Sequence, residues 1–197
     1  MEPTALSTNG SWAVSSSGTV GGDDTIRVVP SRAAQGQWGT RKYNGFYTCH
    51  VTESTVAHGV QIAKELIELG SLNTVPFDWQ HALKTLRMIM VSDMWFPRLA
   101  YNSNGLCGTL LGHADTFFHS PRLVAHENGW FVREGTPFRA KIAMTLMREF
   151  MEWALQYKGA DHIQCGDIAN IRPIAVDALY RKLGFKRYGV IYRYGGE

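Results

Sequence analysis

The chain has 197 residues, 45% of them hydrophobic and 19% charged, which is the composition of a soluble globular protein with one core. Its net charge of +3 is too weakly positive to indicate a nucleic-acid-binding protein. No stretch reaches the roughly 20 uninterrupted apolar residues of a membrane span, and the N-terminus lacks the basic and apolar regions of a signal peptide.

The cysteine and histidine patterns exclude two further classes of site. Cys49, Cys107 and Cys165 are odd in number and form no Cys-x-x-Cys pair, so we expect reduced thiols and a cytoplasmic protein. The histidines are scattered and show no His-x-x-x-His or similar ligand spacing. We therefore predict no metal site.

Residues 1–40 differ in composition from the rest of the chain. They are rich in Gly, Ser and Thr, show no hydrophobic period and offer few apolar side chains for burial. Two interpretations remain open for this segment: a mobile arm, or an arm that is ordered by a partner. The remainder, residues 41–197, is predicted to be one folded domain.

The first half of the domain is predicted to contain one strand and two helices. Residues 46–51 are compatible with a short strand. An apolar stripe then predicts a helix that is capped by Thr52 and ends at Gly70. Asp78 is expected to cap a second helix that continues to Met90.

A meander of three strands is predicted next. Residues 95–101 and 106–118 flank Asn-Ser-Asn-Gly, which is a hairpin signal. Pro97 indicates that the first of these strands lies at a sheet edge or contains a bulge. The third strand covers residues 124–132, and Gly129 within it indicates a bulge.

A long amphipathic helix is predicted after a Gly-Thr-Pro turn and continues to Lys158, with Gly159 as its stop. Its apolar face repeats at three- and four-residue spacing. The side chains predicted on its opposite, polar face are Lys141, Thr145, Arg148, Glu149, Glu152 and Gln156.

The C-terminal part is predicted to add a buried strand at residues 162–165, a helix from Pro173 to Leu183 and a hairpin at residues 185–194. The resulting order is β-α-α-β-β-β-α-β-α-β-β. We therefore predict an α/β protein whose mixed sheet has helices on both faces.

The start of the long helix is a candidate binding site. Where a strand turns sharply into a helix, the first helical N–H groups have no acceptor within the helix, and they form a site for a phosphate or pyrophosphate. Arg139 and Lys141 add positive charge in this first turn.

Three segments of the chain carry a family resemblance: AHENGWFV, FRAKIAMTLMREFMEWALQYKGADHI and ALYRKLGFKRYGVIYRY. They resemble Gcn5-related N-acetyltransferases (GNAT), in particular the type common in bacteriophage genomes, over about residues 43–194. The acetyl-CoA loop of that family reads Gln/Arg-x-x-Gly-x-Gly/Ala. The aligned residues here are 138–143, and Lys141 replaces a glycine, so the loop is degenerate.

The resemblance implies the GNAT fold and the transfer of acetyl from acetyl-CoA to an amine, directly within a ternary complex. It implies that Glu127 is the base for the amine and that Tyr180 protonates the CoA thiolate. The backbone of the strand before the loop would hold the pantetheine arm, and the loop amides would hold the pyrophosphate. The residues implied to bind acetyl-CoA are Phe131, Val132, Arg139, Ala140, Lys141, Ile142 and Ala143.

Structural interpretations remain beside these roles. Glu127 would equally suit an ion pair with a neighbouring Arg or Lys, and Tyr180 would suit packing on an amphipathic helix. Asp115 and Asp167 are weaker candidates for the base. His113 and His119 could line a substrate groove, and Cys165 is interpreted as a core residue.

Two functions remain open from the sequence. The first is an N-acetyltransferase of the cytoplasm, or of the host cytoplasm for a phage protein, with acetyl-CoA and an amine acceptor that the sequence does not identify. The second is a structural or interaction protein that keeps the fold without catalysis. Residues 1–40 would then attach it to a virion or another assembly.

Overall fold

The computed structural model describes residues 38–70, 75–117, 119–166 and 173–187. Several predicted features lie outside these residues: the arm up to residue 37, Asp167, and the final hairpin from residue 188 onward. Residues 185–187 are described and are not part of a strand.

The described strands form one mixed sheet in the order β1-β2-β3-β4-β5-β6. Neighbouring strands are antiparallel except β5 and β6, which are parallel. The strands are β1 (Arg41–Tyr43), β2 (Phe46–His50), β3 (Trp95–Asn102), β4 (Gly105–Thr116), β5 (Leu123–Val132) and β6 (His162–Gln164).

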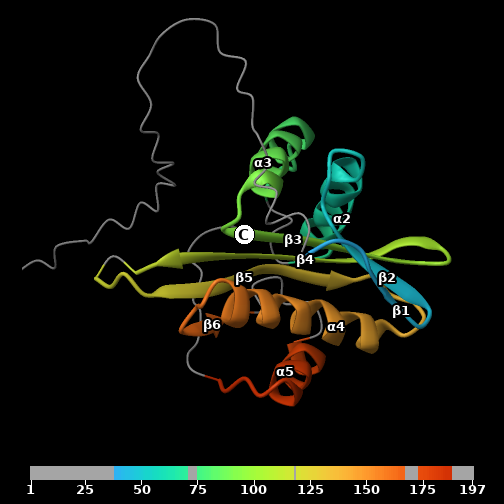
Figure 1. Cartoon of the computed structure of the whole chain (residues 1–197). Helices are drawn as coiled ribbons and strands as arrows, with labels where there is room; N and C mark the ends of the chain where they lie inside the picture. The colour runs from blue at the N-terminus through green and yellow to red at the C-terminus, as the bar shows by residue number, and fades with distance from the viewer. Residues whose placement is uncertain (1–37, 71–74, 118, 167–172, 188–197) are drawn as a thin grey trace, which may run out of the picture.

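Helices cover both faces of the sheet, as predicted (Figure 1). Two lie on one face, α2 (Val56–Leu69) and α3 (Trp79–Val91). The other face carries α4 (Arg139–Glu152), its π-helical continuation η1 (Trp153–Tyr157) and α5 (Pro173–Lys182). The hydrophobic core is divided accordingly into one cluster beneath α4 and a second beneath α2 and α3.

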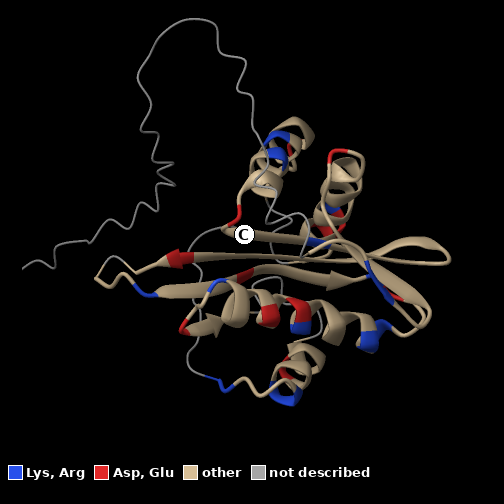
Figure 2. Ribbon diagram, viewed as in Figure 1, with Lys and Arg blue, Asp and Glu red and all other residues tan. Residues whose placement is uncertain are grey.

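Charged residues of both signs lie along α2, α4 and α5, whereas α3 carries only basic ones (Figure 2). Within the described residues, none of the helices combines the length and apolar character that crossing a membrane requires.

The sheet contains one strand that the sequence analysis missed. Tyr43 pairs with Phe46 in a hairpin whose two turn residues are Asn44 and Gly45, and Gly45 has a φ of 89°. Asn-Gly is the strongest two-residue hairpin signal, and of the two turn residues only Gly45 has a positive φ here. The three residues of β1 were too short and too charged to show a strand period.

The expectation for Pro97 is wrong, because β3 lies between β2 and β4 in the interior of the sheet. The carbonyl of Pro97 accepts from the amide of Val51, so its nitrogen also faces the β2 side, just after β2 has ended at His50. The missing N–H therefore removes no bond to β4. The irregularity in β3 falls later, between Ala100 and Tyr101.

The expectation that Glu149 faces solvent is also wrong. Its side chain is 2% exposed and accepts from Arg98 Nε at 2.6 Å, and Arg98 is itself fully buried in β3. Tyr43 and Thr48 donate to the second carboxylate oxygen at 2.6 and 2.7 Å. The helical period marked Glu149 as polar without showing that an arginine on the sheet would meet it.

Three local predictions need smaller corrections. The residue that precedes α2 is Thr55, and Thr52 instead donates its amide to the Thr55 hydroxyl at 2.9 Å. Strand β6 is an edge strand of the described sheet, and His162 and Gln164 are exposed instead of buried. The long helix widens to a π-helix over η1 before it ends near Gly159, as predicted, where φ is 69°.

Candidate functional site

The site begins where β5 separates from its parallel neighbour β6. Within the described residues, β6 pairs with β5 from Val124 to His126 and no further. A bulge follows immediately, because Leu111 pairs with Gly129 whereas Gly112 pairs with Glu127. Asn128 is thus the extra residue, as the glycine in this strand had indicated. The segment from Glu127 to Val132 keeps its backbone edge towards α5 free of a described strand.

A cavity of about 620 Å³ opens at this separation. Residues of α2 and α3 line it from one face of the sheet, and residues of α4 and α5 line it from the other. Most of the lining is apolar, including Leu66, Phe77 and Leu86. The cavity therefore passes from one face of the sheet to the other beside the bulge in β5.

Glu127 and Tyr180 meet in this cavity, although 53 residues separate them in sequence. The Tyr180 hydroxyl donates to Glu127 Oε2 at 2.9 Å. Trp130 fixes the phenol ring by packing against it with ring centroids 5.4 Å apart, while its own Nε1 donates to the carbonyl of Ala143 at 3.1 Å. A carboxylate and a phenol in contact form a pair through which a proton can pass.

The Cys165 thiol is not a nucleophile at this site. Burial raises its pKa strongly, and the nearby charge of Glu127 raises it further. The thiol therefore stays protonated at neutral pH, which agrees with the interpretation of Cys165 as a packing residue.

The loop before α4 places helical amides at the edge of the cavity. Phe138 precedes the helix with a φ of 59°, a left-handed conformation, and packs over Gly45 of the β1–β2 turn. The amides of Arg139 and Ile142 already donate to the carbonyls of Thr136 and Phe138. Among the described residues of this turn, the amides of Ala140 and Lys141 remain without a backbone acceptor.

Lys141 occupies an ordinary helical position, so its backbone does not need the conformational freedom of glycine. Its ammonium lies 5.9 Å from the ring centre of Phe46 and 6.0 Å from that of Phe138. The side chain is therefore held beside the loop by two aromatic faces, where it adds positive charge to the helix start.

The remaining residues expected to bind the cofactor have mixed positions. Phe131 and Val132 are buried on opposite faces of β5, and the Arg139 side chain donates to the Val132 carbonyl at 2.9 Å. A ligand that bonded this carbonyl would have to displace Arg139. The side chains of Ile142 and Ala143 belong to the core beneath α4.

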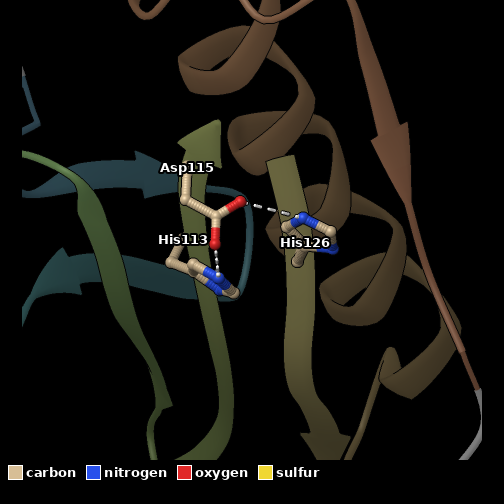
Figure 3. Close-up of side chains that lie close together, drawn as sticks. All are labelled: His113, Asp115 and His126. Atoms are coloured by element: carbon tan, nitrogen blue, oxygen red, sulfur yellow. Dashed lines mark ion pairs between the residues drawn. The ribbon is translucent and has the colours of Figure 1, made fainter. Parts of the chain in front are cut away.

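Asp115, proposed as a weaker base, is not part of the described lining of the cavity. It lies beside His113 and His126 on strands β4 and β5 (Figure 3). His119 follows β4, and its ring stacks on Phe117 at 5.3 Å. The grouping of Asp115 with two histidines was not predicted from the sequence. The spacing His113-x-Asp115 on one strand was an available signal, since alternate strand residues share a face.

Comparisons with known proteins support the fold. No protein-family model and no curated protein matches the sequence. Among solved structures, an aminoglycoside N-acetyltransferase in complex with CoA has a TM-score of 0.61 at 15% identity, over 80% of this chain and 96% of that one.

Two enzymes from Acinetobacter have similar structures. The aminoglycoside antibiotic 6'-N-acetyltransferase from A. baumannii has a TM-score of 0.56 at 20% identity, over 78% of this chain and 99% of that one. The corresponding enzyme from A. haemolyticus has a TM-score of 0.57 at 14% identity, over 76% and 97%. The six-stranded mixed sheet with its helices and these similarities together show that the chain has the mixed α/β fold of the GNAT acyl-CoA N-acyltransferases.

Proposed function

We propose that the protein is an N-acetyltransferase that moves acetyl from acetyl-CoA directly to an amine. The hydrogen-bonded pair of Glu127 and Tyr180 carries this proposal, because a carboxylate and a phenol 2.9 Å apart inside the cavity can serve as base and acid. The solved structures of this fold include complexes with CoA and with a CoA bisubstrate analogue, which supports acetyl-CoA as the donor.

The pair can return the proton that the reaction moves. An amine attacking the thioester carbonyl must lose a proton, and Glu127 is the carboxylate in the cavity that accepts it. As the carbon–sulfur bond breaks, the Tyr180 hydroxyl gives its proton to the thiolate. The protonated Glu127 then returns a proton to the phenolate across their hydrogen bond, which leaves both groups ready for another turnover.

The start of α4 would bind the CoA pyrophosphate. The amides of Ala140 and Lys141 face outward from a helix N-terminus, where the partial positive charge of the helix favours an anion. The Lys141 ammonium and the Arg139 guanidinium add full charges. The pantetheine arm would lie along β5 from Glu127 to Phe131, where the described part of β6 does not pair with it.

The acceptor is better matched by an amine on an apolar body than by an aminoglycoside, the substrate class named for the similar structures. An aminoglycoside carries several ammonium groups, and each needs an acceptor or water. Among the described residues that line the cavity, Glu127 is the single carboxylate, and the side from α2 and α3 is largely apolar. Apolar side chains favour an aromatic or aliphatic substituent beside the reacting amine.

Calorimetric titration with acetyl-CoA tests the donor. We expect one binding site per chain, and binding that is weakened at least tenfold by Lys141→Glu, which places a negative charge beside the pyrophosphate. Lys84→Glu is the matched control, because Lys84 is exposed on α3 and is not part of the described cavity lining. No heat of binding at millimolar acetyl-CoA would refute the enzyme and leave the structural interpretation.

A paired assay tests the acceptor class. The release of free CoA thiol would be followed with an aromatic monoamine and with an aminoglycoside at equal concentrations. We expect a higher kcat/KM for the monoamine because its ring enters the apolar cavity without desolvating additional charges. A preference for the aminoglycoside would refute the acceptor class while leaving the acetyltransferase proposal intact.

A further inference from the structure

His113, Asp115 and His126 form a cluster outside the proposed active site, and we propose that it binds a divalent transition-metal ion of the Zn²⁺ type. The cluster lies on β4 and β5 (Figure 3). Ala114 and Ala125 point into the core beneath α4, so the cluster projects from the opposite face of the sheet. His113 and His126 are directly opposed in the β4–β5 register, and Asp115 follows two positions later on β4. All three side chains therefore project from the same face.

The distances suit a metal bound between the three side chains. The carboxylate of Asp115 lies between the two imidazoles, with Oδ2 3.4 Å from His113 Nε2 and Oδ1 3.2 Å from His126 Nε2. Zinc–ligand bonds of about 2.0–2.2 Å at a tetrahedral angle separate neighbouring ligand atoms by about 3.3–3.6 Å. One donor atom from each residue lies within 4.8 Å of the others, so a small closure would complete three ligands.

The surroundings of His113 hold its ring in the orientation that a metal requires. Its Nδ1 lies 2.6 Å from Asn128 Oδ1, and Trp95 stacks on the ring at 4.8 Å. A carbonyl oxygen accepts a hydrogen bond from Nδ1–H, so Nε2 is the ring nitrogen that can bind a metal, and it faces the Asp115 carboxylate. A metal-binding histidine usually donates its other ring N–H to a nearby oxygen, as His113 does to Asn128.

The two rings and the carboxylate favour a shared cation. The imidazoles stack with centroids 4.9 Å apart. A lone pair of His113 facing a carboxylate is unfavourable unless a positive ion lies between them. Imidazole nitrogens select Zn²⁺, Ni²⁺ or Cu²⁺ over Mg²⁺ and Ca²⁺, which prefer oxygen ligands.

The metal would link the two strands of the β4–β5 hairpin. Its three ligands join the two strands at the bulge, where Asn128 contacts His113 and the next residue after His126 is Glu127. A bound ion would fix the register at this point and so hold the backbone that carries Glu127. The side chain of Asp115 is 59% exposed, which leaves a route for the ion from solvent.

Thermal unfolding of the full chain, made without a histidine tag and stripped with EDTA, tests the site. With Zn²⁺ at about a hundredfold excess over Kd, we expect Tm to rise by about 5–10 °C, and EDTA to reverse the rise. Calorimetry should give one Zn²⁺ per chain. Substitution with Co²⁺ should give the intense visible absorption of a tetrahedral site.

Asp115→Asn and His126→Gln should each weaken Zn²⁺ binding at least tenfold. Asp115 is largely exposed, so its substitution leaves the core intact, and unchanged Tm of the metal-free variant checks this. His81→Gln on α3 removes a histidine outside the cluster and should bind Zn²⁺ as the parent does. Failure of Zn²⁺, Ni²⁺ and Co²⁺ to bind would overturn the proposal, as would binding that both cluster variants retain.

Discussion

At the scale of single residues, Glu127 and Tyr180 make the sharpest prediction, because their contact couples the two proposed roles. Each of Glu127→Gln and Tyr180→Phe should lower kcat by about 10²–10⁴-fold, the usual contribution of general acid–base catalysis. The kcat of the double variant should be only slightly lower than that of the less active single variant, because one proton passes through both groups. Steady-state kinetics on the preferred acceptor measures all three.

The affinity for acetyl-CoA shows whether these three variants lose only catalysis or also their folded structure. We expect Kd for acetyl-CoA to stay within about threefold in every variant, because neither group is placed at the pyrophosphate. Tyr157→Phe is the matched control, as it removes a phenol in η1, away from the described cavity lining. If the fold-loss in kcat of the double variant equals the product of the two single losses, the side chains of Glu127 and Tyr180 act independently.

His50 makes a prediction about pH. Burial lowers the pKa of His50 and Arg98 lowers it further, while a hydrogen bond to the Met90 carbonyl acts in the opposite direction. As pH falls, the unfolded chain therefore binds the proton first, near its ordinary pKa of about 6.5. The stability due to neutral His50 is complete above that pH and is lost as pH falls towards the lower, folded pKa.

His50→Gln keeps a side-chain N–H for Met90 and cannot titrate. Between about pH 7 and pH 5 we expect its free energy of unfolding to fall less steeply than that of the parent. Urea unfolding at a series of pH values measures both slopes, and the carboxylates contribute equally to each. Parallel curves for the two proteins would mean that His50 is protonated as readily in the folded state as in the unfolded state.

At the scale of the elements, the ion pair of Arg98 and Glu149 joins β3 to α4 in the core. Removing one member leaves the other charge buried without its partner, so Glu149→Gln and Arg98→Met should each destabilise by about 3–5 kcal/mol. The combined Arg98→Met/Glu149→Leu variant should lose less free energy of unfolding than the two single variants lose together, because no unpaired charge remains. Denaturant unfolding gives the three values.

A more exposed pair on the same helix is the control. Arg41 and Glu152 are 30% and 41% exposed, and their bond of 2.7 Å lies at the end of α4. Arg41→Met should cost only about 0–1 kcal/mol, since solvent screens the pair. Similar losses from Arg41→Met and Glu149→Gln would contradict the view that burial makes the core pair important.

The same elements show what the sequence could reveal. Local signals located the helices and the meander: Asp78 accepts from the His81 amide as a cap, and Gly105 adopts a φ of 101° in the expected turn. The partner of Glu149 lies 51 residues away in sequence, and the contact of Glu127 with Tyr180 spans 53. Such contacts depend on how elements pack, so no local period predicts them.

The candidate site, too, was predictable only in part from the sequence. The resemblance pointed to Glu127, Tyr180 and the start of α4, but their mutual geometry came from the separation of β5 and β6 and from the bulge at Asn128. The absence of a His-x-x-x-His pattern argues only against a pair of metal ligands on one helix. His113 and His126 are paired across the neighbouring strands β4 and β5. Their pairing depends on the register between these strands, of which β5 has 10 residues.

At the scale of the whole molecule, the segment before β1 closes the core beneath α4. Trp38 is 3% exposed, and its ring lies 5.4 Å from Phe96 of β3 and 6.2 Å from Tyr157 of η1. The buried guanidinium of Arg98 donates to the carbonyls of Trp38 and Gly39. These contacts precede residue 41, where the composition of the chain changes.

Two truncated chains, one beginning at Trp38 and one at Arg41, follow from these contacts. The first is the reference, because it begins at the first described residue. The second lacks the Trp38 ring and two acceptors of Arg98, and it should lose at least about 3–5 kcal/mol, the usual cost of removing a buried tryptophan. Trp38→Ala in the full chain should reproduce most of that loss. Equal stability of the two truncated chains would show that the core closes without Trp38, and that the folded domain begins where the composition changes.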